Sequence, residues 1–224
     1  MFKVDLHTHS EASPDGGLTP NQYQKALKDL TLDYIAITDH NRIDVAQSIQ
    51  QTLGQQIIVG EEIMTSAGEI IGLFLQELIP AGLSPTETID RVKSQGGLVY
   101  IPHPFETVRK GLHPGVLEEI ADQIDIVEVC NGRSFLQNRN AQTVVWARLN
   151  HKAGAASSDA HGYRGLGKTY TSLEAPPTAD NLQLLMATAK LITDHPNLHS
   201  LLYPTYHRWR RKLKSLVYAA SGGR

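Results

Sequence analysis

The sequence contains a single cysteine, Cys130, among its 224 residues, and it lacks both a secretory signal and any long apolar run. One cysteine can form neither an internal disulfide nor a metal site built from several thiolates. The N-terminus does not show the charged-then-apolar pattern of a signal peptide, and the apolar stretches are too short to cross the ~30 Å hydrocarbon core of a bilayer. We therefore expect a cytoplasmic protein without a transmembrane segment.

Acidic residues are absent after Asp194, although the whole chain carries a formal net charge of −2. The segment after Asp194 holds six of the 21 lysines and arginines, so residues 1–194 carry 15 basic and 23 acidic side chains, a net charge of −8. An acidic body is a poor general clamp for nucleic acid and suits bound cations better. Nucleic acid is therefore a less favoured partner than a small molecule.

The basic tail that begins at residue 196 has a helical pattern of its own. Trp209, Leu213 and Leu216 recur at helical spacing, with arginines and lysines between them. We expect a helix that packs these apolar side chains against the body and turns its cations toward solvent. Contact with an anionic membrane surface or with nucleic acid is the alternative.

Apolar runs alternate with helical patterns through most of the chain. Seven of the runs predict buried strands: Phe2–Leu6, Tyr34–Thr38, Gln56–Gly60, Ile70–Leu75, Leu98–Ile101, Ile124–Val129 and Ala153–Ser157. Helices are expected from Thr19-Pro20, from Ser84-Pro85, and over 42–53, 114–122, 135–150 and 180–192. The tight connection Thr65–Gly68 leaves no room for a helix between the third and fourth strands. This order predicts an α/β fold with one closed or nearly closed barrel in residues 1–195, followed by a basic helical appendage in residues 196–224.

Side chains that can bind metal ions follow five of the predicted strands. The five motifs are His7-Thr8-His9, Thr38-Asp39-His40, Gly60-Glu61-Glu62, Pro102-His103-Pro104 and Ser158-Asp159-Ala160-His161. Each motif alone more often has a structural role, but separate structural roles would not concentrate histidines at strand ends, where a barrel gathers its functional groups. Residues two apart in extended chain face the same way, so only one of Glu61 and Glu62 is expected to point inward. Imidazole and carboxylate donors without cysteine suit Zn²⁺, Mn²⁺ or Fe²⁺, and they exceed the needs of one ion.

The other five histidines are expected on the surface: His113, His151, His195, His199 and His207.

The five motifs, with Asp5-Leu6 before the first of them, resemble the ordered motif set of the polymerase and histidinol phosphatase (PHP) superfamily and its small stand-alone members. The resemblance spans about residues 2–173. It implies a distorted (β/α)7 barrel of the TIM-like kind, two or three divalent metal ions at the carboxyl end of the strands, and hydrolysis of phosphoesters.

The resemblance also implies a set of metal ligands. The first ion would be held by His7, His9, Glu62 and Asp159, the second by His40 and His161, and the third by His103 with Glu62 shared. Asp15 lies in a loop where many members have another histidine and is expected to replace it. The fourth strand ends in Phe74-Leu75-Gln76, where members with three ions often have a histidine, so two and three ions remain alternatives.

The expected reaction is hydrolysis of a small-molecule or nucleotide phosphate ester by in-line attack of a hydroxide that bridges the metal ions. Arg133 is a candidate clamp for the phosphate, and Arg42 is a second candidate. Asp39 would orient a ligand histidine or protonate the leaving oxygen, and His161 would act in catalysis as well as in metal binding. Two alternatives stay open: a small metal-dependent nuclease, and a metal-binding module without catalysis.

Overall fold

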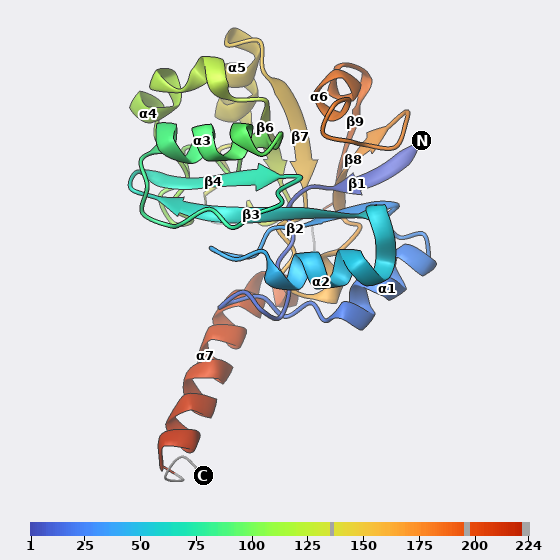
Figure 1. Cartoon of the computed structure of the whole chain (residues 1–224), viewed down its shortest axis with the longest axis vertical. Coiled ribbons are helices and arrows are strands. Elements are labelled where there is room, and N and C mark those ends of the chain that lie inside the picture. The colour runs from blue at the N-terminus through green and yellow to red at the C-terminus, as the bar shows by residue number, and fades with distance from the viewer. Residues whose placement is uncertain (135–136, 195–197, 221–224) are drawn as a thin grey trace.

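The computed structural model describes residues 1–134, 137–194 and 198–220, and it contains one mixed sheet that curves into a nearly closed barrel (Figure 1). The strand order is β7-β6-β5-β4-β3-β2-β1-β8-β9. The strands are β1 (Phe2–Asp5), β2 (Tyr34–Ile37), β3 (Ile57–Thr65), β4 (Gly68–Leu73), β5 (Leu98–Ile101), β6 (Ile126–Asn131), β7 (Ala153–Ser157), β8 (Thr169–Leu173) and β9 (Lys190–Thr193). The structure confirms the predicted α/β barrel.

Strand direction decides which residues reach the mouth of the barrel. The pairs β1–β2, β2–β3, β5–β6 and β6–β7 are parallel, so their carboxyl ends share one side. β4 runs antiparallel to both β3 and β5, because the short turn after Thr65 reverses the chain. The first residues of β4 therefore lie at the same end as the last residues of its neighbours.

The barrel closes between β7 and β1 with help from β8. The amide of His9 donates to the carbonyl of Ala160 at 2.9 Å, which joins the segments that follow β1 and β7. β8 pairs antiparallel with β1, and its Thr171 hydroxyl both accepts from the Ala156 amide at 3.0 Å and donates to the Ala156 carbonyl at 2.9 Å. A side chain thus completes the hydrogen bonding where no regular ladder runs between β7 and β8.

Helices cover the outside of the strands. They are α1 (Pro20–Lys28), α2 (Asp44–Leu53), α3 (Pro85–Ser94), α4 (Pro114–Glu119) and α5 (Asn140–Leu149). Two further helices, α6 (Leu182–Leu185) and α7 (Leu198–Ala220), come after β8 in the chain. At the start of α3, the Ser84 hydroxyl accepts from the Glu87 amide at 3.2 Å, and the Glu87 carboxylate accepts from the Ser84 amide at 3.0 Å. This reciprocal cap explains why the predicted helix begins at Pro85. Within the described ranges, no helix is both long and apolar enough to cross a membrane.

Alternating side chains fill two apolar layers. Along β2, Ile35 and Ile37 belong to the layer between sheet and helices, whereas Ala36 belongs to the layer inside the barrel. Ile57 and Ile58 of β3 divide in the same way. Burial on both faces is why these strands are continuously apolar in the sequence.

Three expectations about the elements are wrong. The region 180–192 was expected to be one helix, but it contains only the short α6 followed by β9, whose exposed residues pair antiparallel with β8. β8 itself was not predicted. β3 continues to Thr65, five residues beyond the expected end, because its antiparallel pairing with β4 extends the ladder.

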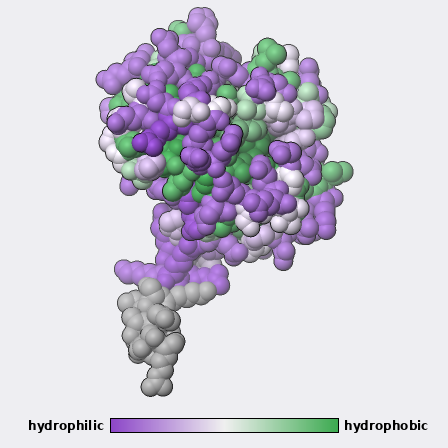
Figure 2. All heavy atoms as spheres, viewed as in Figure 1, coloured by the Kyte–Doolittle hydropathy of each residue, from purple (hydrophilic) through white to green (hydrophobic). Residues whose placement is uncertain are grey.

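The basic tail forms the long helix α7, which projects from the body (Figure 1). Its described side chains are largely hydrophilic where they leave the barrel (Figure 2). The Trp209 side chain is 61% exposed and Leu213 is 40% exposed, so the expectation that both pack against the barrel is wrong. The Leu216 side chain lies outside the described residues. The helix contacts the body through residues between Tyr203 and Arg211.

Candidate metal centre

All eight predicted metal ligands lie together at the carboxyl end of the barrel strands. Their candidate ligand atoms form four overlapping groups, within each of which the atoms lie within 4.8 Å of one another: His9, Asp15, His40 and His161; His7, Glu62 and His103; His7, His9 and Asp159; and His40, Glu62 and Glu69. Parallel strands bring these distant residues together because their carboxyl ends meet on one side.

The deepest group consists of two histidines and two carboxylates. The Nε2 atoms of His7 and His9 lie 3.0 Å apart. An oxygen of Asp159 lies 3.4 Å from Nε2 of His9 and 3.7 Å from Nε2 of His7, and an oxygen of Glu62 lies 3.3 Å from Nε2 of His9. All four side chains are buried. Nitrogen and carboxylate oxygen donors that face one point in this way fit a divalent transition metal ion.

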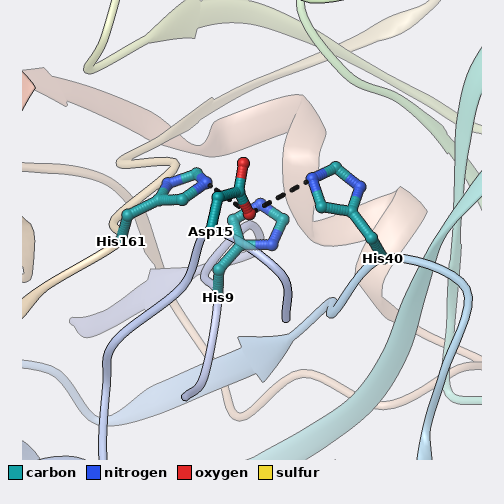
Figure 3. Close-up of side chains that lie close together, drawn as sticks. All are labelled: His9, Asp15, His40 and His161. Atoms are coloured by element: carbon teal, nitrogen blue, oxygen red, sulfur yellow. Dashed lines mark ion pairs between the residues drawn. The ribbon is translucent and has the colours of Figure 1, made fainter. Parts of the chain in front are cut away.

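A second group surrounds Asp15 (Figure 3). One oxygen of Asp15 lies 3.4 Å from Nε2 of His161 and 3.6 Å from Nε2 of His40. Burial opposes ionisation of Asp15, but hydrogen bonds from His161 and His40 outweigh it and hold the pKa of this carboxyl well below its usual range. The structure thus places Asp15 among the histidines, where a histidine was expected in many family members.

A third group contains a residue that the sequence reasoning missed. Nε2 of His103 lies 3.2 Å from Glu62, and Glu69 approaches His103 to 3.8 Å and His40 to 3.6 Å. Burial first, and then the charge of Glu62, raise the pKa of Glu69 to about 9. Glu69 reaches the mouth because β4 runs antiparallel, so the start of that strand, and not Phe74 at its end, faces the centre. The tight turn before Gly68 was the signal that could have found it.

The choice between Glu61 and Glu62 follows the alternation of side chains along β3. Glu62 faces the histidines, whereas Glu61 points to the other face, where it accepts from the Ile79 amide at 2.9 Å. The expectation that one member of the pair faces inward is confirmed.

A buried carboxylate lies behind the first pair of histidines. One oxygen of Glu128 accepts from Nδ1 of His7 at 3.1 Å, and the other accepts from the His103 amide at 2.7 Å. In the neutral ring, with Nδ1 donating, Nε2 of His7 would carry the lone pair that a metal ligand needs. Burial opposes ionisation of Glu128, but the neighbouring His7 outweighs it and lowers its pKa. The signal for Glu128 was a charged residue directly between the apolar residues Val127 and Val129 of the predicted strand.

Two arginines approach Asp159. Nη1 of Arg133 lies 3.2 Å from Asp159 and 3.2 Å from Nδ1 of His161. Arg109, which sequence reasoning missed, donates to Asp159 at 2.7 Å and to Asn131 at 2.6 Å, while Glu106 holds its other nitrogens at 2.8 and 2.6 Å. Arg109 comes from an irregular loop, for which the sequence offers no periodic signal.

Two other candidates lie outside the cavity that the ligands line. Arg42 pairs with Asp44 at 2.8 and 2.7 Å on the surface. Asp39 accepts from the Ser10 amide at 2.7 Å and from its hydroxyl at 2.5 Å, and burial raises the pKa of Asp39 to about 6. Asp39 therefore ties the start of the loop at residues 10–17 to the end of β2.

The five remaining histidines divide among three outcomes. His113 and His151 are exposed as expected. His207 is half-buried: its ring lies against Gly17 and stacks with Tyr203 at a centroid distance of 5.8 Å, so its expected surface position is wrong. His195 and the His199 side chain lie outside the described residues.

The cavity at the centre has a volume of about 460 Å³. Most of the ligand set lines it, together with Met64, Val108, Arg109, Lys110, Arg133 and Arg208. Burial opposes a charged His7, yet the carboxylates of Asp159 and Glu62 outweigh it and raise the pKa of His7 well above its usual value. This excess of negative charge is what a bound divalent cation would balance, so the residues present fit such an ion.

Comparison with known proteins places the chain in a family. Residues 5–133 match the model of the PHP domain, and residues 137–190 match the PHP-associated model. Two uncharacterised proteins of Methanocaldococcus jannaschii are similar: MJ1587 is 37% identical over 165 residues, covering 68% of this chain and 96% of its own, and MJ0417 is 38% identical over 178 residues, covering 75% of this chain and 69% of its own.

A solved structure has the same fold. It is a two-domain protein of Bacteroides vulgatus that contains a predicted PHP-like metal-dependent phosphoesterase; it aligns with a TM-score of 0.68 at 19% identity, over 92% of this chain and 69% of that one. Because the PHP model matches more than half of the chain, in the segment that carries most of the ligand set, this protein belongs to the PHP domain family.

Proposed function

We propose that this protein is a metal-dependent phosphoesterase that hydrolyses the phosphate ester of a small molecule or nucleotide. The observation that carries the proposal is that one cavity of about 460 Å³ holds both the convergent metal ligands and the Arg133 guanidinium. A phosphate ester needs both: cations at its oxygens, and donors that fix its orientation.

Divalent ions bound here would lower the pKa of water and balance charge on the phosphoryl oxygens. By the pairwise distances between their side chains, the residues that would hold them fall into three sets: His7, His9, Glu62 and Asp159; Asp15, His40 and His161; and His103, Glu69 and shared Glu62. Glu69 supports a third site despite the missing histidine at the end of β4. Zn²⁺, Mn²⁺ and Fe²⁺ all suit these donors.

Of the two half-buried arginines, Arg133 is better placed to bind a phosphate. Its hydrogen bonds to Asp159 both come from Nη1, the atom that also lies nearest to Nδ1 of His161, and its buried Nε has no hydrogen-bond partner among the described residues. The side-chain nitrogens of Arg109, by contrast, donate hydrogen bonds to Glu106, Asn131 and Asp159. We therefore assign the phosphate to Arg133 and the alignment of Asp159 to Arg109.

His161 and Asp39 have distinct parts in the proposal. Nδ1 of His161 lies 2.9 Å from the carbonyl of Asp159, a contact in which the nitrogen donates, so Nε2 is directed to the second ion. Both carboxylate oxygens of Asp39 accept hydrogen bonds from Ser10. Of the two roles open to Asp39, these contacts favour positioning of the histidine that follows it over proton donation to the leaving oxygen.

The test combines metal analysis with a panel of substrates. The purified protein is loaded with Zn²⁺, Mn²⁺ or Fe²⁺, its metal content per chain is measured, and hydrolysis of sugar, amino-alcohol and nucleotide phosphates and of 4-nitrophenyl phosphate is assayed. His9→Ala removes a nitrogen common to two ligand groups, so we expect a loss of about a hundredfold or more. His151→Ala removes an exposed imidazole and serves as the matched control. Arg133→Gln is expected to raise KM at unchanged metal content.

Two outcomes would favour the alternatives. Full metal occupancy without hydrolysis of any phosphoester would refute the proposal and support a metal-binding module without catalysis. Hydrolysis confined to oligonucleotides, with a steep loss of rate as salt is added, would support the nuclease instead.

A further inference from the structure

The helix α7 lies beyond both segments that match the family models, which end at residues 133 and 190, yet its residues between Tyr203 and Arg211 contact loops of the metal centre. The helix lies against two loops. The Tyr203 ring faces Gly162, where an added Cβ would come within 2.7 Å of the ring, and the His207 ring faces Gly17, where an added Cβ would come within 2.2 Å. These loops supply His161 and Asp15 to the second group of ligands.

Backbone hydrogen bonds from the amides of Glu11, Ser13 and Gly16 hold the loop that carries Asp15, but the Asp15 carboxylate has little support from within this loop. Asp15 is followed by Gly16 and Gly17, and glycine has the widest choice of backbone conformations. Within the loop, the Ser13 hydroxyl donates to Asp15 at 3.3 Å, a long contact. A ligand on such a segment needs an external support if its oxygen is to stay within coordination distance of two histidines.

Two arginines of α7 provide contacts of the required kind. Arg208 donates from Nη1 to the outer oxygen of Asp15 at 3.3 Å, while the inner oxygen of Asp15 faces His161 and His40. Arg211 donates from Nη2 to the carbonyl of Glu11 and, at 3.4 Å, to the carbonyl of Gly16. The helix therefore holds the Asp15 loop at both ends and at the carboxylate itself.

We propose that α7 completes the second metal site, with Arg208 and Arg211 as positioning residues that fix Asp15 for coordination. Metal-binding carboxylates are commonly held by hydrogen bonds on the oxygen that does not coordinate, and loss of such a partner weakens metal binding by about ten- to a hundredfold. The inference rests on the proposed function only in taking Asp15 as a ligand, and it does not depend on which ester is cleaved.

The direction in which metal affinity changes on removal of Arg208 distinguishes a positioning role from a purely electrostatic one. Arg208 is a cation close to a cation site, so a purely electrostatic role would oppose metal binding, and its removal would strengthen binding. A positioning role predicts the reverse. Arg208→Ala is therefore expected to weaken binding of the second ion about ten- to a hundredfold. Arg208→Gln, which keeps a hydrogen-bond donor without the charge, is expected to recover much of the loss.

The experiment titrates the chain of 224 residues, freed of metal, with Mn²⁺ or Zn²⁺ in competition with a chromophoric chelator, so that successive ions are resolved without any assay of hydrolysis. Arg211→Ala is expected to weaken the second ion in the same direction as Arg208→Ala. Arg210→Ala removes the same charge from the same helix and is the control; its metal affinities should stay within about twofold of the parent. Thermal unfolding in excess chelator checks that each variant folds.

Asp15→Ala separates the two possible failures. If Asp15→Ala leaves the second ion unaffected, Asp15 is not a ligand and that part of the proposed function fails. If Asp15→Ala weakens the second ion but Arg208→Ala leaves it unchanged or strengthens it in a folded variant, the inference about α7 alone is overturned.

Discussion

Replacing Glu128 by glutamine tests how the first metal site is assembled. The two oxygens of Glu128 accept four hydrogen bonds: Oε1 from Nδ1 of His7 and the Tyr100 hydroxyl, each at 3.1 Å, and Oε2 from the His103 amide at 2.7 Å and the Asn131 side chain at 2.8 Å. An amide can accept on one side only. Its NH₂ group must therefore face one of these two pairs.

The two orientations of the new amide differ greatly in cost. If NH₂ faced the His103 amide and Asn131, two buried donors would lose their acceptor, at about 1–3 kcal/mol each. If NH₂ faces His7 and Tyr100, the Tyr100 hydroxyl can turn toward Ser157, 2.8 Å away, and His7 can accept at Nδ1. The second arrangement keeps the fold, but it moves the proton of His7 to Nε2, the atom that would bind metal.

We therefore expect Glu128→Gln to lose about 1 kcal/mol or less of unfolding free energy but ten- to a hundredfold in affinity for the first ion. Chelator competition measures the affinity, and denaturant unfolding of the metal-free protein measures the stability. Glu61→Gln is the matched control, because this buried carboxylate accepts from the Ile79 amide on the other face of β3. Unchanged metal affinity in a folded Glu128→Gln variant would refute the role of Glu128 in setting the tautomer.

Three further predictions concern the metal, the barrel seam and the cysteine. Removing metal held at a thousandfold excess over Kd should cost about 4 kcal/mol of stability and lower Tm by about 10 °C in calorimetry, and an unchanged Tm would contradict linked binding and folding. Thr171→Val should cost about 2–4 kcal/mol in denaturant unfolding because both backbone groups of Ala156 lose their partner, whereas Thr171→Ser should cost far less. Burial raises the pKa of Cys130 to about 11, so its alkylation rate should rise about tenfold per pH unit from pH 7 to 10; a plateau below pH 9 would contradict this.

The parts of the centre that were predictable from sequence depend on local repetition. Strands buried on both faces are continuously apolar, so their ends could be located, and the paired spacing of His7 and His9 implied that both face one way. Alternation likewise implied that only one of Glu61 and Glu62 faces the centre, and these inferences needed only the order of side chains along one strand. The choice of Glu62 came from the family resemblance.

The parts that were missed depend on pairing between distant segments. The residues of β9 are exposed, and they form a strand because they pair with the edge of β8. The sequence pattern of residues 190–193 alone does not reveal this pairing. Glu69 reaches the centre only because β4 is antiparallel, and Arg109 only because its loop folds back onto Asp159. The contact of Arg208 with Asp15 joins residues 193 positions apart.

Charge balance links these observations. Burying a carboxylate without compensation is costly, and Glu62, Glu69 and Asp159 face one cavity together. Arg109 and Arg133 compensate Asp159, but Glu69 has a pKa near 9, so it would hold a proton at neutral pH unless another cation approached. A divalent ion would supply that charge and displace the proton. Metal binding at the third site should therefore release protons, and its affinity should rise with pH up to about 9.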